Sequence, residues 1–134
     1  MIKTHRKLAR EKAVFSIYQW LLLNASLEEL ELFLDSNSTL VKDEEARKYA
    51  EQLIQTVMGN FAGYRLEISR YLKKGWTFER LSYLEQAILL VAIAELKELG
   101  IDRKIAANEA VELAKQYCDE DSYRFINGIL KNIE

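Results

Sequence analysis

The sequence predicts an all-α protein, and three observations support this fold class. The 134 residues include no proline and only five glycines, so residues that break helices are scarce. Leu, Ala, Glu and Lys, which favour helix, are abundant throughout. No segment alternates polar and apolar residues for long enough to form a strand. We therefore expect residues 1–134 to fold as a compact single domain of about seven helices.

Capping residues and apolar spacing predict the first elements. A helix is expected over residues 4–23. Ser26 and Glu29 have the spacing of a capping box, in which each side chain bonds the other's backbone N–H, and this pair opens a short helix over residues 27–34. Residues 35–43 are rich in Asp, Ser and Asn and are expected to be a loop.

The next stretch predicts a helix, a break and a further helix. Asp43 can cap a helix whose apolar residues fall on one face. These residues are Ala46, Ala50, Leu53 and Val57. Gly59 and Gly63 indicate a break before another helix over residues 64–74.

A second capping box, formed by Ser82 and Glu85, opens the most apolar segment of the chain. The helix over residues 86–99 is apolar on nearly every side, so we expect it to be the central, most buried helix. Gly100 stands where a helix end favours a left-handed residue. Another helix is expected over residues 102–118.

The last helix combines packing residues with a basic and aromatic pair. The acidic turn at residues 119–122 is expected to cap a helix over residues 123–133. Gly128 inside this helix costs about 1 kcal/mol relative to alanine, which suggests that another backbone or a ligand comes close. Arg124 and Phe125 at its start could pair and stack with single-stranded RNA. The alternative is that Phe125 belongs to the core and Arg124 is an ordinary surface residue.

The first ten residues concentrate positive charge in a chain whose net charge is −2. Lys3, Arg6, Lys7 and Arg10 share one helical face, and none of the 21 acidic side chains lies in this segment. Cations are not buried without partners, so this basic, mobile segment is expected to project past the body or to lie along its rim. It is either a solvated terminus or a strip that binds a polyanion such as nucleic acid.

The sequence offers little to catalysis, metals or membranes. His5 is the one histidine, and Cys118 has no histidine beside it that would activate a thiolate. A Cys/His metal site is excluded by count, and no glycine-rich phosphate loop occurs. No apolar run approaches the roughly 20 residues of a membrane helix, and Glu11 and Lys12 interrupt the pattern of a secretory signal. We expect a non-enzymatic, soluble, cytoplasmic protein without cofactors.

Five stretches, taken together in order and spacing, resemble the NusB family of bacterial transcription antitermination factors. They are RKLAREKAVFSIYQW at 6–20, W-x-x-x-R-L at 76–81, LEQAILLVAIAEL at 84–96, IAANEAVELAK at 105–115 and DSYRFINGIL at 121–130. The resemblance implies a compact all-helical domain built from two small bundles. It also implies an antitermination factor that binds boxA RNA of ribosomal RNA leader transcripts. That binding would be joint with NusE, a small-subunit ribosomal protein, in a complex on RNA polymerase.

The resemblance also assigns site residues. The family's arginine-rich N-terminus matches His5, Arg6, Lys7 and Arg10, and its basic-Phe pair matches Arg124 and Phe125. With Lys3 from the basic strip, the expected RNA-binding residues are Lys3, His5, Arg6, Lys7, Arg10, Arg124 and Phe125. The expected partner-binding residues are Trp76, Arg80, Glu85 and Asp121.

One departure from the family supports a second hypothesis. The family often has an arginine where this chain has Leu90, so one RNA contact is missing. The alternative function is a protein-interaction or homodimeric helical module with little RNA binding of its own. Measuring boxA binding with and without NusE separates the two hypotheses.

Overall fold

The computed structural model describes residues 4–134, and within this range every regular element is helical. The all-α prediction is confirmed. The elements are α1 (His5–Leu23), α2 (Leu27–Ser36), α3 (Ser38–Val41), α4 (Glu44–Ser69), a 3₁₀ turn η1 (Phe78–Arg80), α5 (Tyr83–Lys97), α6 (Arg103–Tyr117) and α7 (Ser122–Asn132).

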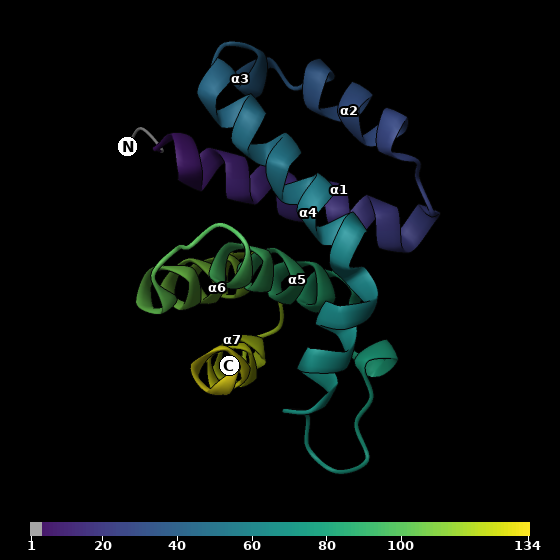
Figure 1. The fold of residues 1–134 in the computed structure, drawn as a ribbon, viewed down its shortest axis with the longest axis vertical. Coiled ribbons are helices and arrows are strands. Elements are labelled where there is room, and N and C mark those ends of the chain that lie inside the picture. The colour runs from purple at the N-terminus through teal and green to yellow at the C-terminus, as the bar shows by residue number, and fades with distance from the viewer. Residues whose placement is uncertain (1–3) are drawn as a thin grey trace.

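The helices form two groups around α5 (Figure 1). In the first group α1 packs along α4, α2 contacts both of these helices, and α3 contacts α2 and α4. In the second group α6 packs along α7. Helix α5 contacts α1, α4, α6 and α7, so it joins the two groups. This arrangement agrees with the two small bundles that the family resemblance implied.

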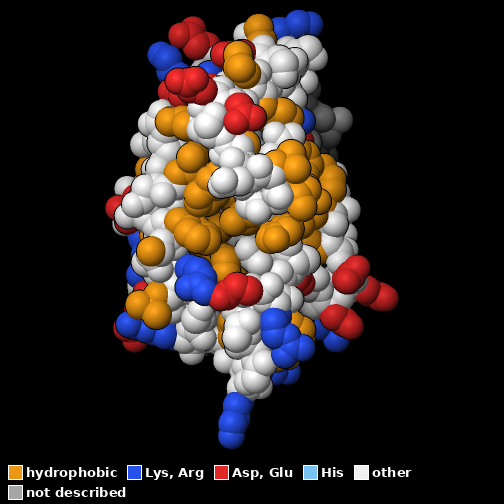
Figure 2. Space-filling model, turned by 90° about the vertical axis from the view of Figure 1, so that its right-hand side faces the viewer, with side chains coloured by type: hydrophobic (Ala, Val, Ile, Leu, Met, Phe, Trp, Pro, Cys, Tyr) orange, Lys and Arg blue, Asp and Glu red, His pale blue; other side chains and the backbone are white. Residues whose placement is uncertain are grey.

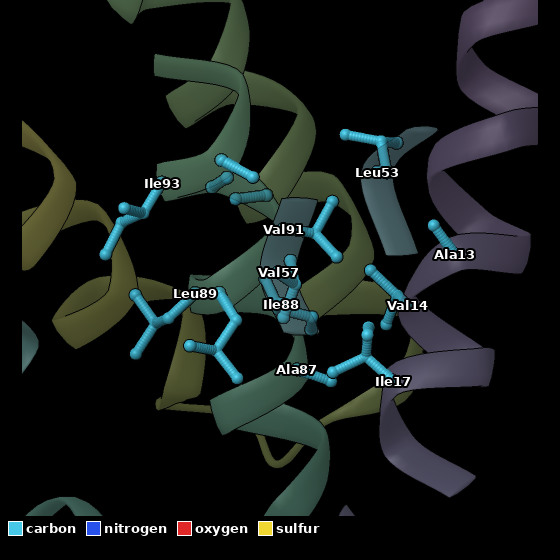
Figure 3. Packing of buried hydrophobic residues seen from close by; sticks show 14 of the residues in the cluster. Ala13, Val14, Ile17, Leu53, Val57, Ala87, Ile88, Leu89, Val91 and Ile93 are labelled. Atoms are coloured by element: carbon cyan, nitrogen blue, oxygen red, sulfur yellow. The ribbon is translucent and has the colours of Figure 1, made fainter. Parts of the chain in front are cut away.

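Helix α5 is the centre of the core, as its sequence predicted. All residues from Gln86 to Glu95 are buried. In Figure 3, Val14 and Ile17 of α1 point toward α5, while Leu89 and Ile93 point to its other side. Each fully buried aliphatic side chain contributes about 1.5–3 kcal/mol, so this helix makes a large contribution to hydrophobic stabilisation.

The two predicted capping boxes are present. The hydroxyl of Ser26 accepts from the Glu29 N–H, the Glu29 carboxylate accepts from the Ser26 N–H, and Ser82 and Glu85 repeat the arrangement. Gly100 has a φ of +66°, in the left-handed region, as predicted. Asp121 of the predicted acidic turn occupies the N-cap position of α7, but its side chain makes no capping hydrogen bond, so the predicted cap is wrong in part.

Helix α4 runs through both glycines that were predicted to break it. Gly59 and Gly63 lie inside one continuous 26-residue helix. Buried residues on both sides of them, Val57 and Tyr64 among them, hold the helix together. The tertiary contacts therefore outweigh a propensity cost of about 1 kcal/mol per glycine.

The predicted loop at residues 35–43 is wrong in part, because it contains the end of α2 and the short α3.

For Gly128, the expected close approach of another backbone is wrong, and the close approach of a ligand stays a prediction. A Cβ atom built at this glycine would meet no atom within 4 Å. Close approach of a backbone or another group within the described chain therefore does not explain the glycine.

Candidate nucleic-acid interface

The basic start of α1 is held against the start of α4. Nδ1 of His5 lies 2.5 Å from Oδ2 of Asp43, and its Nε2 lies 3.3 Å from Glu45. The other carboxylate oxygen of Asp43 caps α4 by accepting from the Ala46 N–H. The hydrogen bond to Asp43, supported by both negative charges, raises the pKa of His5 above its ordinary value of 6.5. This end of α1 therefore lies along the rim of the molecule.

Two cations of this segment reach the surface. Arg6 is exposed, and its guanidinium lies 5.2 Å from the centre of the Tyr49 ring. Lys7 donates from Nζ to Oε1 of Glu109 at 2.8 Å and to Oε2 of Glu112 at 2.9 Å. These bonds raise the pKa of Lys7, and 38% of its side chain remains exposed. Both residues can meet a phosphate.

Arg10 does not lie on this surface, so it is not placed for the contact with RNA that the sequence predicted. Its side chain is only 6% exposed, and its Nε donates to Oε1 of Glu95 at 2.7 Å. The hydroxyl of Tyr49 donates to the other oxygen of Glu95 at 2.6 Å. A buried partner from α5 satisfies the charge that the sequence alone placed on the surface. Lys3, the remaining predicted cation, lies outside the described residues.

The start of α7 carries the second basic and aromatic group. The side chain of Arg124 is 73% exposed, and its Nε donates to the Tyr123 hydroxyl at 3.2 Å. Nζ of Lys115 lies 4.7 Å from the centre of the Tyr123 ring. Phe125 is partly buried and packs against the core. Asp121, directly before the helix, has 89% of its side chain exposed.

Helix α6 lies between the cations at the start of α1 and the basic and aromatic residues at the start of α7. Its residue Glu112 bonds Lys7 of α1, and Lys115, one turn further along, lies over Tyr123 of α7. The order Lys7, Glu112, Lys115, Tyr123, Arg124 thus runs across three helices. The sequence predicted the two ends of this path. It missed Lys115, because the role of this residue depends on how α6 packs on α7.

An aromatic groove lies beside the start of α7. It has a volume of about 490 Å³ and is lined by residues of α1, the start of α5, the end of α6 and the start of α7. Phe15 and Tyr117 meet edge to face, with 5.0 Å between ring centres. The Tyr117 hydroxyl donates to Glu11 at 2.8 Å. Tyr18, one turn after Phe15, is the sequence signal that could have indicated this groove.

The predicted partner-binding residues fall into two kinds. Trp76 is 48% exposed, and the guanidinium of Arg80 lies 4.7 Å from the centre of its ring. Glu85, however, is used internally: its carboxylate accepts from the Ser82 N–H at 2.9 Å and from the Ser122 hydroxyl at 2.6 Å. Glu85 therefore fixes the start of α7 to the start of α5.

A broad apolar area covers the right-hand side of the molecule in Figure 1, seen face-on in Figure 2. Leu22 and Leu23 at the end of α1 and Leu66 of α4 are exposed, at 47%, 69% and 60%. Trp20 and Phe61 pack edge to face, with 5.1 Å between ring centres. Apolar area of this kind is typical of contact with another protein.

Other chemistry is sparse in the described chain. Within residues 4–134, no three His, Cys, Asp or Glu side chains are grouped so that they could hold a metal ion. No helix in that range has the length and apolar character needed to cross a membrane. Burial raises the pKa of the Cys118 thiol to about 11, so the thiol is protonated near neutral pH. Leu90 is fully buried, so this position contributes no surface contact.

The fold and this surface define a class: small all-helical domains that present cations and aromatic rings together. The NusB family model matches residues 7–134, and the chain belongs to the NusB family.

The comparisons with known proteins agree along almost the whole chain. The chain is 38% identical over 130 residues to the transcription antitermination protein NusB of Bacillus mycoides, covering 96% of each. It is similar to the structure of T. maritima NusB, with a TM-score of 0.85 and 32% identity over 98% of this chain and 92% of that one. It is also similar to a chain in the structure of the antitermination factors NusB and NusE in complex with dsRNA. There the TM-score is 0.87 and the identity 28%, over 98% and 97% of the two chains.

Proposed function

We propose that this chain is a transcription antitermination factor that binds boxA-type RNA of ribosomal RNA leader transcripts together with NusE. The observation that carries this proposal is the match to a chain of the NusB–NusE complex with RNA. The family membership and the antitermination proteins among the relatives support it. The protein would act within the antitermination complex of RNA polymerase, as an assembly factor rather than an enzyme, in the cytoplasm and without a cofactor.

The RNA strand would follow the path from the start of α1 to the start of α7. Arg6, Lys7 and His5 supply positive charge at one end, and Arg124 supplies it at the other. Exposed guanidinium and ammonium groups pair with phosphates, and an open aromatic ring stacks with a base. Phe125 is only partly buried, and we propose that its ring stacks with a base.

NusE would bind to surfaces other than the proposed RNA path between the start of α1 and the start of α7. Trp76 and Arg80 form an exposed stacked pair. Asp121 is 89% exposed and lies 4.0 Å from the guanidinium of Arg124, a long surface ion pair that a partner cation could replace. Glu85 acts indirectly in this proposal, because its carboxylate is bonded to Ser82 and Ser122. The apolar area of Figure 2 supports a protein contact of larger size.

The test is a mixture of this protein, purified NusE and a boxA RNA oligonucleotide, analysed by gel filtration. We expect one ternary species, and a scrambled RNA of the same length should be retained less. The double variant R6A/R124A should keep NusE and lose RNA. A protein–NusE species that retains boxA no better than scrambled RNA would favour the protein-interaction module instead.

A further inference from the structure

The candidate RNA surface contains an internal competitor for one of its own cations. Lys7 on α1 is bound by two carboxylates of α6, with Nζ 2.8 and 3.0 Å from the oxygens of Glu109 and 2.9 Å from Oε2 of Glu112. A phosphate that pairs with Lys7 must displace or share these bonds. The ammonium is therefore present on the surface and already occupied.

The two carboxylates differ in what else they contact. Glu109 is 19% exposed in its side chain and lies 3.9 Å from the buried guanidinium of Arg10, so it also balances the charge of the interior. Glu112 is 65% exposed, and within residues 4–134 Lys7 is the cation with which it pairs. Removal of the charge of Glu112 thus takes away one of the two carboxylates that hold Lys7, while Glu109 still bonds Lys7 and stays beside the buried Arg10.

Glu112 would oppose RNA in two ways. It neutralises Lys7, and its own negative charge stands beside any phosphate that approaches Lys7. An exposed ion pair is weak, however, so a phosphate can replace it. Glu112 is therefore expected to lower the affinity for RNA without abolishing binding.

We propose that Glu112 is an autoinhibitory residue, which holds Lys7 in an ion pair and thereby lowers the affinity of the free protein for RNA. The inference rests on the proposed function, because it concerns regulation of the same surface. It predicts that this carboxylate is exchanged for an RNA phosphate when the strand binds.

The test is the variant E112Q, compared with the unmodified protein by fluorescence anisotropy of a labelled boxA RNA with NusE present. We expect E112Q to bind about two- to five-fold more tightly, as the loss of one exposed competing ion pair allows. The matched control is E28Q, which removes the same charge on α2, away from α6 in Figure 1. E28Q should change the affinity much less.

A double-mutant cycle with Lys7 distinguishes inhibition through the Lys7 ion pair from direct repulsion between Glu112 and the RNA phosphates. If Glu112 acts by holding Lys7, the gain from E112Q disappears in a K7Q background. A gain that persists in K7Q, or that E28Q equals, would overturn the autoinhibitory role of Glu112. If the protein and its variants bind no boxA RNA with NusE, the proposed function fails as well, whereas bound RNA that is insensitive to E112Q refutes only this inference.

Discussion

The guanidinium of Arg10 lies 2.7 Å from the carboxylate of Glu95, and the two side chains are 6% and 1% exposed. This pair joins α1 to α5, and the Tyr49 hydroxyl, which donates to the same carboxylate, adds α4. Burial and the bond to Glu95 raise the pKa of Tyr49, so its hydroxyl stays a donor. The arginine thus has a structural role at the centre of three helices.

Breaking this pair should cost far more stability than removing both partners. R10M leaves the buried Glu95 carboxylate without its counter-ion, and E95Q leaves Arg10 with only the more distant Glu109, at 3.9 Å. We expect either variant to lower the free energy of unfolding by roughly 3–5 kcal/mol. The double variant R10M/E95M should recover most of that loss, because no charge remains buried. Urea denaturation followed by circular dichroism measures all three. Single variants that each lose less than about 1 kcal/mol would contradict the importance of the pair.

The salt dependence of RNA binding should distinguish surface cations from the buried one. Each phosphate neutralised on a single strand contributes roughly −0.7 to the slope of log K against log salt. We expect R6A and R124A each to flatten the slope by about that amount. R10M, measured where it remains folded, should leave the slope unchanged, because its charge is paired with Glu95. Equal flattening by R6A and R10M would mean that burial does not decide which arginine meets RNA.

The glycines allow a test of helix propensity with an internal control. Gly59 and Gly128 lie inside helices, and an added Cβ at either would meet no atom within 4 Å. G59A and G128A should therefore each raise the free energy of unfolding by about 0.5–1 kcal/mol. Gly100 also has open space, but its φ is +66°. G100A should lower the free energy by about 1–2 kcal/mol, since a left-handed alanine is strained. Thermal or urea denaturation gives each value, and destabilisation by G128A would contradict the open space found around Gly128.

The features that sequence predicted well are local ones. The capping boxes at Ser26 and Ser82 follow from spacing over three residues, and the burial of α5 follows from its composition. The predicted break at Gly59 was wrong because contacts with other helices hold α4 together. The predicted exposure of Arg10 was wrong for a similar reason, since its partner Glu95 is 85 residues away along the chain.

The candidate site shows the same division. The cations of α1 and the Arg124–Phe125 pair could be found from charge clustering and motif resemblance. The contribution of α6 could not, because Lys115 and Glu112 gain their roles only when α6 packs between α1 and α7. A helix that looks ordinary in sequence thus supplies both a further cation and a competing carboxylate.

His5, the one histidine of the chain, should report the charge state of the basic end directly. Asp43 and Glu45 raise its pKa above 6.5, so its ring signals in NMR should titrate above that value. D43N should lower the titration midpoint toward 6.5, while Asn still caps α4 through the Ala46 N–H.

The same raised pKa has a defined consequence for stability against pH. Because folding raises the pKa, the contribution of protonated His5 is fully present below pH 6.5 and is lost as the pH rises through the folded value. The stability difference between the unmodified protein and H5Q should therefore shrink as the pH rises through that window. Denaturation of both proteins at a series of pH values measures it. A difference that is constant with pH, or one that grows, would show that the ion pair with Asp43 does not persist in solution and that the start of α1 is held by other contacts.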